Sequence, residues 1–183
     1  MWYRPGDANQ NAVGQVFVNA SLTLLKEDDK KLRFNFAHDT DITPIIGALG
    51  VLSPKEHLPI DRVVFDSKWS TGDIVPMAGH LTIERLQCSS TPISDKGKYV
   101  RLVINEAVVP VDTCQSGPGY SCPLQEFTEV ISKDLPSFVD ACQVPEKYPQ
   151  YQEFWWKYNL TSELNFAKSA ATCAQTTTDP FGR

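Results

Sequence analysis

The chain contains 183 residues, of which 42% are hydrophobic, and it carries a formal net charge of −5. That length and apolar content allow one compact domain with its own core. The mild acidity and the lack of any block of like charges argue against nucleic acid or a membrane surface as a partner. No apolar run approaches the roughly 20 residues needed to cross a bilayer. We therefore expect a soluble domain.

The first third of the chain predicts a helix followed by a strand. Apolar side chains recur at helical spacing over residues 12 to 27, which indicates an amphipathic helix. A polar loop over residues 26 to 31 follows. Residues 32 to 36 then alternate apolar and polar side chains, as a strand does. His38 and Asp39 come directly after this predicted strand.

A second helix is predicted immediately after the His-Asp pair. Asp41 or Thr43 would cap its N-terminus, Pro44 is tolerated in its first turn, and Gly50 would stop it after Leu49. The order helix, strand, His-Asp, helix is typical of a βα unit in an α/β sheet.

The second half of the chain predicts strands joined by turns. Residues 79 to 86 and 99 to 105 predict two strands, and a turn at residues 105 to 107 leads into a third over residues 108 to 111. Residues 115 to 120 are rich in glycine and proline and predict a loop.

The last predicted helix begins at Pro123, with Leu124, Phe127, Ile131 and Leu135 along one face. Beyond this helix the spacing of apolar residues no longer predicts a helix or a strand.

Residues 144 to 158 fit no single element, and the tail after Cys173 has the composition of a disordered segment. No internal repeat or domain boundary is visible. We assign residues 1 to 175 to one α/β domain and residues 176 to 183 to a disordered tail.

The cysteines allow a prediction about metal binding and disulfide pairing. There are five, Cys88, Cys114, Cys122, Cys142 and Cys173, without C-x-x-C spacing and far from any histidine. A zinc site is therefore not expected, and we expect no metal or cofactor. An odd number of cysteines leaves at least one thiol without a partner inside the chain.

Two glycosylation sequons point to an oxidising, extracellular history together with the cysteines. They begin at Asn19 and Asn159. The N-terminus lacks the apolar core of a signal peptide, so the sequence fits a piece of a larger secreted protein. The alternative is a cytosolic protein with free, buried cysteines, which composition alone does not exclude.

The strongest candidates for chemistry are His38 and Asp39. Ligands of open α/β sheets bind at the carboxyl ends of strands, where a helix N-terminus offers free N–H groups to a phosphate. A protonated His38 would add a charge-assisted hydrogen bond, and Asp39 could donate a proton to a leaving oxygen. In the alternative, Asp39 or Asp41 only caps the helix and His38 is a surface residue.

Other polar residues have simpler explanations. His57 lies in a proline-flanked loop and receives no role, and His80 on a predicted strand fits a packed or hydrogen-bonded residue. Asp66 and Asp73 flank Trp69 in what we expect to be a polar surface loop.

An aromatic group near the C-terminus could pack in the core or face a partner. It comprises Tyr151, Phe154, Trp155, Trp156 and Tyr158.

Several segments, in order, resemble the histidine acid phosphatases. Residues 34 to 51, FNFAHDTDITPIIGALGV, are similar to the second catalytic motif of that family, and residues 17 to 25 match the region upstream. Residues 78 to 86, AGHLTIERL, and 99 to 105, YVRLVIN, resemble the strands that follow. The likeness covers residues 13 to 175 and is nearest to the fungal phytases and low-pH acid phosphatases.

This resemblance implies a fold and two residue roles. The fold would be that of the histidine phosphatases (phosphoglycerate mutase-like), here an incomplete α/β sheet flanked by helices. His38 would contact the phosphate of a monoester such as phytate. Asp39 would protonate the departing alcohol and later assist water against a phosphohistidine, which suits an acidic working pH.

The sequence departs from the family pattern at the nucleophile. The family motif R-H-G-x-R-x-P is absent, since none of His38, His57 and His80 follows an arginine or precedes a glycine. The family carries this motif near its N-terminus, in a region that this chain does not contain. We therefore expect the chain alone to be inactive on phosphate esters.

The resemblance also implies how the cysteines pair. Cys114 and Cys122 would form a local disulfide, whereas Cys88, Cys142 and Cys173 would pair with the missing region and so remain free thiols here. A sheet that lacks members would expose apolar surface, so the isolated chain should aggregate readily.

Two functions remain open at this point. The chain is either a fragment of a secreted phosphomonoesterase, which we favour, or a short non-catalytic module that binds phosphate or a partner on the same fold. The sequence does not decide whether the protein forms a homo-oligomer.

Overall fold

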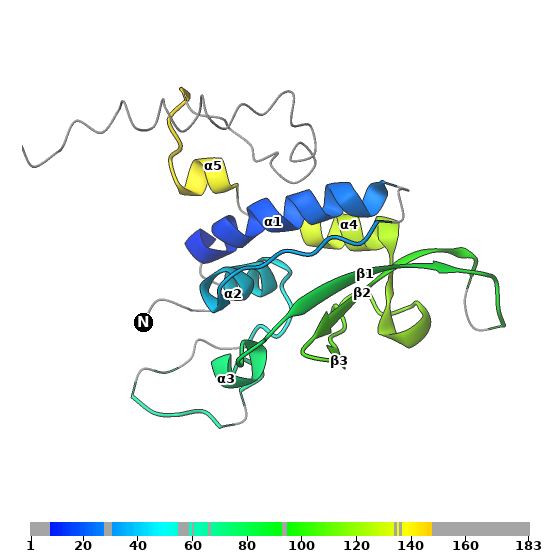
Figure 1. The fold of residues 1–183 in the computed structure, drawn as a ribbon, viewed down its shortest axis with the longest axis horizontal. Coiled ribbons are helices and arrows are strands. Elements are labelled where there is room, and N and C mark those ends of the chain that lie inside the picture. The colour runs from blue at the N-terminus through cyan, green and yellow to red at the C-terminus, as the bar shows by residue number, and fades with distance from the viewer. Residues whose placement is uncertain are drawn as a thin grey trace, which may run out of the picture. The chain divides into compact units, whose positions relative to one another are not determined.

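The structure is a computed structural model, and it describes residues 8–27, 31–54, 59, 61–65, 67–92, 95–133, 135 and 137–147. All of them belong to one compact unit, residues 1–150. None of the helices in these ranges combines the length and apolar character that a membrane span requires. The mixed α/β class predicted from the sequence is confirmed, with helices packed on a small antiparallel sheet (Figure 1).

Two helices at the start of the unit pack directly against each other. Helix α1 spans Ala8–Lys26, which confirms the predicted helix with an earlier start, and α2 spans Asp39–Ala48. Gly14 of α1 lies against the backbone of Pro44, and a Cβ at this position would clash with the Pro44 carbonyl. Only glycine permits so close an approach between the two helices.

The predicted strand over residues 32 to 36 is wrong for this structure. Residues 31–38 are extended, but the sheet that the described residues form contains only β1 to β4. Leu32, Phe34 and Phe36 are 84%, 79% and 100% exposed. A strand requires a neighbour that accepts its backbone hydrogen bonds, and this segment has none among the described strands.

The predicted cap of α2 is also wrong. The N-cap is His38, not Asp41 or Thr43. Asp41 lies at the third helical position and accepts a hydrogen bond from the His38 amide through Oδ2 at 3.0 Å. The helix starts earlier than predicted because the Asp41 carboxylate accepts the hydrogen bond of the His38 amide. In addition, the carboxylates of Asp39 and Asp41 then lie at the positive end of the helix dipole.

The remaining predictions for α2 concern its interior and its end. Pro44 lies beyond the first turn, inside the helix, and Thr43 donates its hydroxyl to the Asp39 carbonyl at 2.8 Å. Gly50 follows the helix with φ +69° and confirms the predicted stop, since glycine adopts this left-handed conformation without strain.

Strand β2 is the centre of the sheet. β1 (Leu81–Cys88) and β2 (Gly97–Ile104) pair antiparallel over their full length, which confirms both predicted strands. On its other edge β2 pairs with β3 (Ala107–Val108) and with β4 (Cys122–Pro123).

The predicted turn at residues 105 to 107 is confirmed. Asn105 and Glu106 both have positive φ, +48° and +69°, as a tight two-residue hairpin turn requires. The third strand is shorter than predicted. Its ladder with β2 ends at Val108, although the Val109 amide still donates to the Leu102 carbonyl at 2.9 Å, and the chain then turns through a bridge between Val111 and Cys114.

Short helices complete the unit. They are α3 (Thr71–Ile74), the single 3₁₀ turn η1 (Pro118–Tyr120), α4 (Leu124–Lys133) and α5 (Phe138–Ala141). The prediction for α4 is confirmed, since Phe127 and Ile131 are buried and Leu124 and Leu135 pack against the core.

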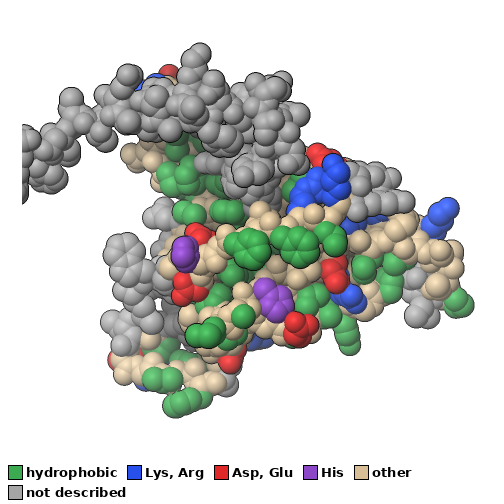
Figure 2. Space-filling model, in the orientation of Figure 1, with side chains coloured by type: hydrophobic (Ala, Val, Ile, Leu, Met, Phe, Trp, Pro, Cys, Tyr) green, Lys and Arg blue, Asp and Glu red, His purple; other side chains and the backbone are tan. Residues whose placement is uncertain are grey.

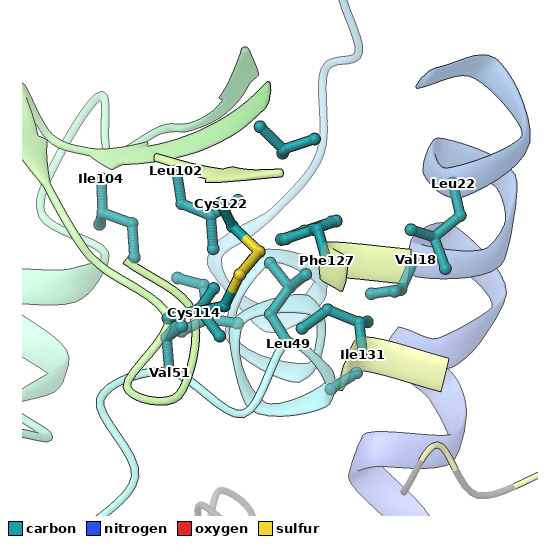
Figure 3. Close-up of a cluster of buried hydrophobic side chains, with 14 of the residues drawn as sticks. Val18, Leu22, Leu49, Val51, Leu102, Ile104, Cys114, Cys122, Phe127 and Ile131 are labelled. Carbon is teal, nitrogen blue, oxygen red and sulfur yellow. A yellow bond between two sulfur atoms is a disulfide. The ribbon is translucent and has the colours of Figure 1, made fainter. Parts of the chain in front are cut away.

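The core lies between the sheet and the helices. Leu102 and Ile104, on the buried face of β2, belong to the same buried cluster as Phe127 of α4 and Val18 and Leu22 of α1 (Figure 3). Phe127 is 1% exposed and Leu102 is 2% exposed. Each such side chain contributes roughly 1.5–3 kcal/mol through burial, so this cluster holds the unit together.

Candidate active site

His38 and Asp39 lie where the extended segment 31–38 becomes α2. His38 has extended backbone angles, φ −88° and ψ 166°, and its carbonyl accepts from the amides of Asp41 at 3.0 Å and Ile42 at 3.2 Å. The pair therefore stands at the N-terminus of a ten-residue helix. This is where a helix dipole favours an anion, and the chemical roles of both residues stay a prediction.

The first turn of α2 already uses some of its backbone donors. The amide of Thr40 donates to Asp39 Oδ1 at 2.8 Å, and the amide of His38 donates to Asp41 Oδ2 at 3.0 Å. The Asp39 carboxylate is thus held beside the helix end by its own neighbour, with Oδ2 left for another partner.

The charges of this stretch do not favour a phosphate by themselves. Residues 38 to 41 contain two carboxyl groups, those of Asp39 and Asp41, and one imidazole, that of His38. A phosphate dianion therefore needs cations from elsewhere in a working site.

The pair stands on an open surface. His38, Asp39 and Thr40 are all exposed. Figure 2 shows histidine side chains on the face drawn there, with hydrophobic and acidic side chains beside them. A hollow of about 540 Å³ lies at the start of α4, between residues such as Lys26, Lys98 and Leu124, and neither His38 nor Asp39 lines it.

His80 and Asp73 lie in a group of hydrogen-bonded residues that links the start of β1, the turn between β2 and β3, and α3. His80 places Nδ1 3.2 Å from the Ala78 carbonyl and Nε2 3.2 Å from Glu106 Oε1. This agrees with the prediction of a hydrogen-bonded residue. Asp73 is exposed, in α3. His57 and Asp66 lie outside the described residues.

Asn105, which the sequence predicts only as a turn residue, also takes part in these hydrogen bonds. Its Oδ1 accepts from the His80 amide at 2.8 Å, and its Nδ2 donates to the carbonyls of Asp73 at 2.7 Å and Ile74 at 2.9 Å. An asparagine at a tight turn tolerates positive φ, and that is the only signal the sequence carried.

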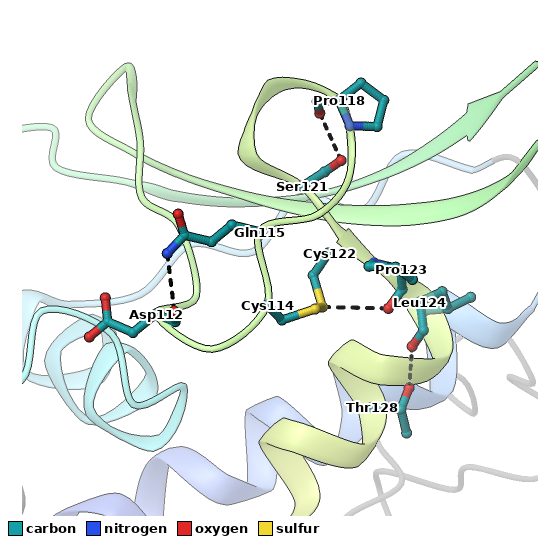
Figure 4. Close-up of a disulfide and its surroundings, with 9 residues drawn as sticks. All are labelled: Asp112, Cys114, Gln115, Pro118, Ser121, Cys122, Pro123, Leu124 and Thr128. Atoms are coloured by element: carbon teal, nitrogen blue, oxygen red, sulfur yellow. Dashed lines mark hydrogen bonds between the residues drawn. A yellow bond between two sulfur atoms is a disulfide. The ribbon is translucent and has the colours of Figure 1, made fainter. Parts of the chain in front are cut away.

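The disulfide predicted between Cys114 and Cys122 is present (Figure 4). Both residues are 2% exposed and belong to the core, and Cys122 lies two residues before α4. Their side chains and that of Glu126 form the one cluster of potential metal ligands among the described residues. Because the two sulfur atoms are bonded to each other, no thiolate remains to bind a metal.

The other predicted modification sites are partly described. Cys88 and Cys142 are free, as expected, whereas Cys173 lies outside the described residues. Asn19 is exposed on α1, and Asn159 lies outside the described residues, as does the aromatic group that begins at Tyr151.

Comparison with known families gives this site its context. The sequence family described as the histidine phosphatase superfamily (branch 2) matches residues 2–105, more than half of the chain. The chain therefore belongs to the histidine phosphatase superfamily, and the resemblance seen in its sequence is confirmed.

Two proteins with similar sequences are a fungal phytase and a fungal acid phosphatase. The chain is 36% identical to Phytase PHO112 of Candida albicans, over 87% of this chain and 35% of the relative. It is 35% identical to Acid phosphatase PHO1 of Komagataella pastoris, over 85% of this chain and 35% of the relative.

A solved structure of similar fold is also that of a phytase. The crystal structure of the phytase from D. castellii superposes with a TM-score of 0.72 at 34% identity. The alignment covers 82% of this chain and 32% of the phytase. The chain thus spans about a third of the length of the proteins it matches.

Proposed function

We propose that this chain supplies the phosphate contact and the proton donor of a secreted phosphomonoesterase, an acid phosphatase or phytase. His38 binds a phosphate oxygen, and Asp39 protonates the leaving alcohol. The observation that carries the proposal is the His38-Asp39 pair at the N-terminus of α2 in a chain of the histidine phosphatase superfamily. Membership in the family turns an otherwise common dipeptide into a candidate site.

The proposed reaction has two steps. A histidine from R-H-G-x-R-x-P attacks phosphorus, the bond from phosphorus to the ester oxygen breaks, and Asp39 gives its proton to that oxygen. The ionised Asp39 then takes a proton from water as the water attacks the phosphohistidine, and inorganic phosphate leaves. These 183 residues contain no R-H-G-x-R-x-P, so in this proposal the nucleophile and the arginines that hold the phosphate lie outside them.

The alternative of a non-catalytic phosphate-binding module is less well supported. The site as described offers one imidazole beside two carboxyl groups, which give little attraction for a phosphate dianion. Two of the amides at the helix start are already bonded to these carboxylates. Binding by this stretch alone would be weak.

Secretion and glycosylation belong to the same proposal. The buried disulfide between Cys114 and Cys122 and the exposed Asn19 within a sequon support an oxidising, extracellular location. Phytate is the proposed substrate among phosphate monoesters, on the basis of the phytases among the relatives.

The experiment compares the chain alone with the chain grafted into a complete phosphatase. In the graft, it replaces the third of the D. castellii phytase that it matches. Hydrolysis of p-nitrophenyl phosphate is measured for both proteins and for His38→Ala in each. We expect no turnover above the His38→Ala control for the chain alone, and activity in the graft that His38→Ala lowers by about 100-fold or more. Turnover by the isolated chain, or a graft that tolerates His38→Ala, would contradict the proposal.

A further inference from the structure

Three segments that are distant in the sequence meet at His80, at one end of the sheet. The amide of Asn105 donates to the His80 carbonyl at 3.1 Å, and the His80 amide donates to Asn105 Oδ1 at 2.8 Å. Asn105 Nδ2 in turn donates to the carbonyls of Asp73 and Ile74. The start of β1, the turn between β2 and β3, and α3 are therefore tied to one another (Figure 1).

The backbone on both sides of these contacts is strained. Ala78, Asn105 and Glu106 have φ values of +62°, +48° and +69°, in the left-handed region that residues other than glycine enter at a cost. Residues in this region persist where neighbouring contacts hold them, and they gather at clamps and switch regions. The contacts of His80 and Asn105 hold them here.

Both ring nitrogens of His80 face an oxygen atom that accepts hydrogen bonds. Nδ1 lies 3.2 Å from the Ala78 carbonyl oxygen, and Nε2 lies 3.2 Å from Glu106 Oε1. A carbonyl group and an ionised carboxylate accept hydrogen bonds but do not donate them. A neutral imidazole has one N–H group and one lone pair, so it satisfies only one of the two oxygens, whereas the protonated ring satisfies both.

We propose that His80 and Glu106 form a clip that closes when the imidazole is protonated and opens when it is neutral. In the closed form the two side chains hold the turn at residues 105 and 106 against the start of β1, and Asn105 carries this restraint to α3. A neutral ring that keeps its N–H group on the Ala78 carbonyl turns a lone pair towards Glu106, and the turn and α3 then open more often. Histidine is the side chain that changes its charge between about pH 5 and 8, so acidification closes the clip.

The surroundings of the clip agree with this direction and set its size. On the segments bonded to His80, the titratable side chains are Glu106 in the turn and Asp73 in α3, and residues 76 to 79 carry none. No lysine or arginine on these segments competes with the imidazolium for Glu106. The side chains of His80 and Glu106 are 48% and 89% exposed. Solvent screens such a pair, so the clip changes local opening a few-fold.

The experiment measures hydrogen exchange of the whole chain by mass spectrometry at about pH 5.5 and about pH 8, on the two sides of the histidine range. Rates are corrected for the intrinsic effect of pH on amide exchange. We expect the segments around residues 105–106 and in α3 to be about threefold more protected at the lower pH. The centre of β2 should differ by less than about 1.5-fold, since its protection comes from the sheet and the core.

Acid-to-amide substitutions identify the clip. The amide of Glu106→Gln donates to a neutral ring nitrogen and accepts from a protonated one, so the contact persists in both states and the difference should fall below about 1.5-fold. Glu106→Ala has no contact in either state, and protection should be low at both pH values. Glu84→Gln is the matched control, because Glu84 is bonded to Arg101 at 2.7 Å and not to His80. It should retain the threefold difference.

The clip does not depend on the proposed function, since it is measured without substrate or activity. Equal protection at both pH values in the unmodified chain would overturn it. So would a difference that persists in Glu106→Gln or Glu106→Ala, or one that Glu84→Gln removes to the same extent. Protection at the centre of β2 shows in each variant that the fold is retained, which the exposure of Glu106 leads us to expect.

Discussion

Two phenylalanines from the two halves of the unit show how differently its surfaces are completed. Phe127 of α4 is 1% exposed, in a core that also contains a disulfide and the central strand β2. Phe36, two residues before the candidate site, is 100% exposed. The chain therefore provides its own packing around β2 and α4, but leaves the approach to His38 and Asp39 uncovered. A unit with a well-packed core thus leaves its candidate site open to solvent.

The largest expected effect contrasts these two residues directly. Phe127→Ala should lower the free energy of unfolding by about 3–5 kcal/mol, because it leaves a cavity in the core. Phe36→Ala should change it by less than about 0.5 kcal/mol, since the side chain contacts solvent. Urea denaturation followed by circular dichroism measures both. Equal losses would mean that Phe36 is packed in the folded chain.

Removing the disulfide should have the next largest effect. The bridge closes a short loop, between residues eight apart, onto the start of α4. Replacing Cys114 and Cys122 together by alanine should cost about 2.5 kcal/mol in the chain-entropy model. Cys88→Ala, which removes a free thiol, is the control. Thiol titration of the denatured chain should find three free thiols, whereas one thiol would reveal a second disulfide.

The contact between α1 and α2 should be sensitive to one methyl group. Gly14→Ala should destabilise the chain by about 1–3 kcal/mol, because its Cβ collides with the Pro44 carbonyl and pushes α2 away. Gly72→Ala in α3 meets nothing within 4 Å and should be neutral or slightly stabilising. A comparison of thermal midpoints tests the pair, and similar midpoints would contradict the close packing.

The smallest expected effect concerns the cap of α2. Asp41→Ala removes the acceptor of the His38 amide and should cost about 1 kcal/mol. Asp112→Ala removes an exposed carboxylate in a loop and serves as the control. Amide exchange at the first turn of α2 should accelerate only in Asp41→Ala. An unchanged exchange rate would show that the cap does not hold the helix start.

Periodicity predicted the elements whose partners lie inside the chain. The alternation in β1 and β2 and the single apolar face of α4 gave the right elements, since both strands pair with each other and Phe127 and Ile131 reach the core. The same alternation at residues 32 to 36 predicted a strand that does not pair here. A pattern records which face of a segment is to be buried, but it does not supply the neighbour.

The site was predicted only in part for a related reason. The sequence placed His38 and Asp39 before a helix, and the structure has them at its first turn. It did not indicate that His38 is the N-cap of α2, because the hydrogen bond from the His38 amide to the Asp41 carboxylate depends on the local backbone conformation. Nor did spacing indicate that Asn105 joins His80 to α3, since these contacts link residues about 25 to 32 positions apart.

The proton-donor role of Asp39 is the central claim, and the leaving group tests it most directly. In the grafted phosphatase, Asp39→Asn is compared with Asp112→Asn on p-nitrophenyl phosphate and on an alkyl phosphate. The nitrophenolate departs without a proton, whereas an alkoxide needs one. We predict that Asp39→Asn lowers kcat/KM on the alkyl ester by about 100-fold or more, lowers it far less on the aryl ester, and that Asp112→Asn changes neither. Equal losses on both esters would contradict the account.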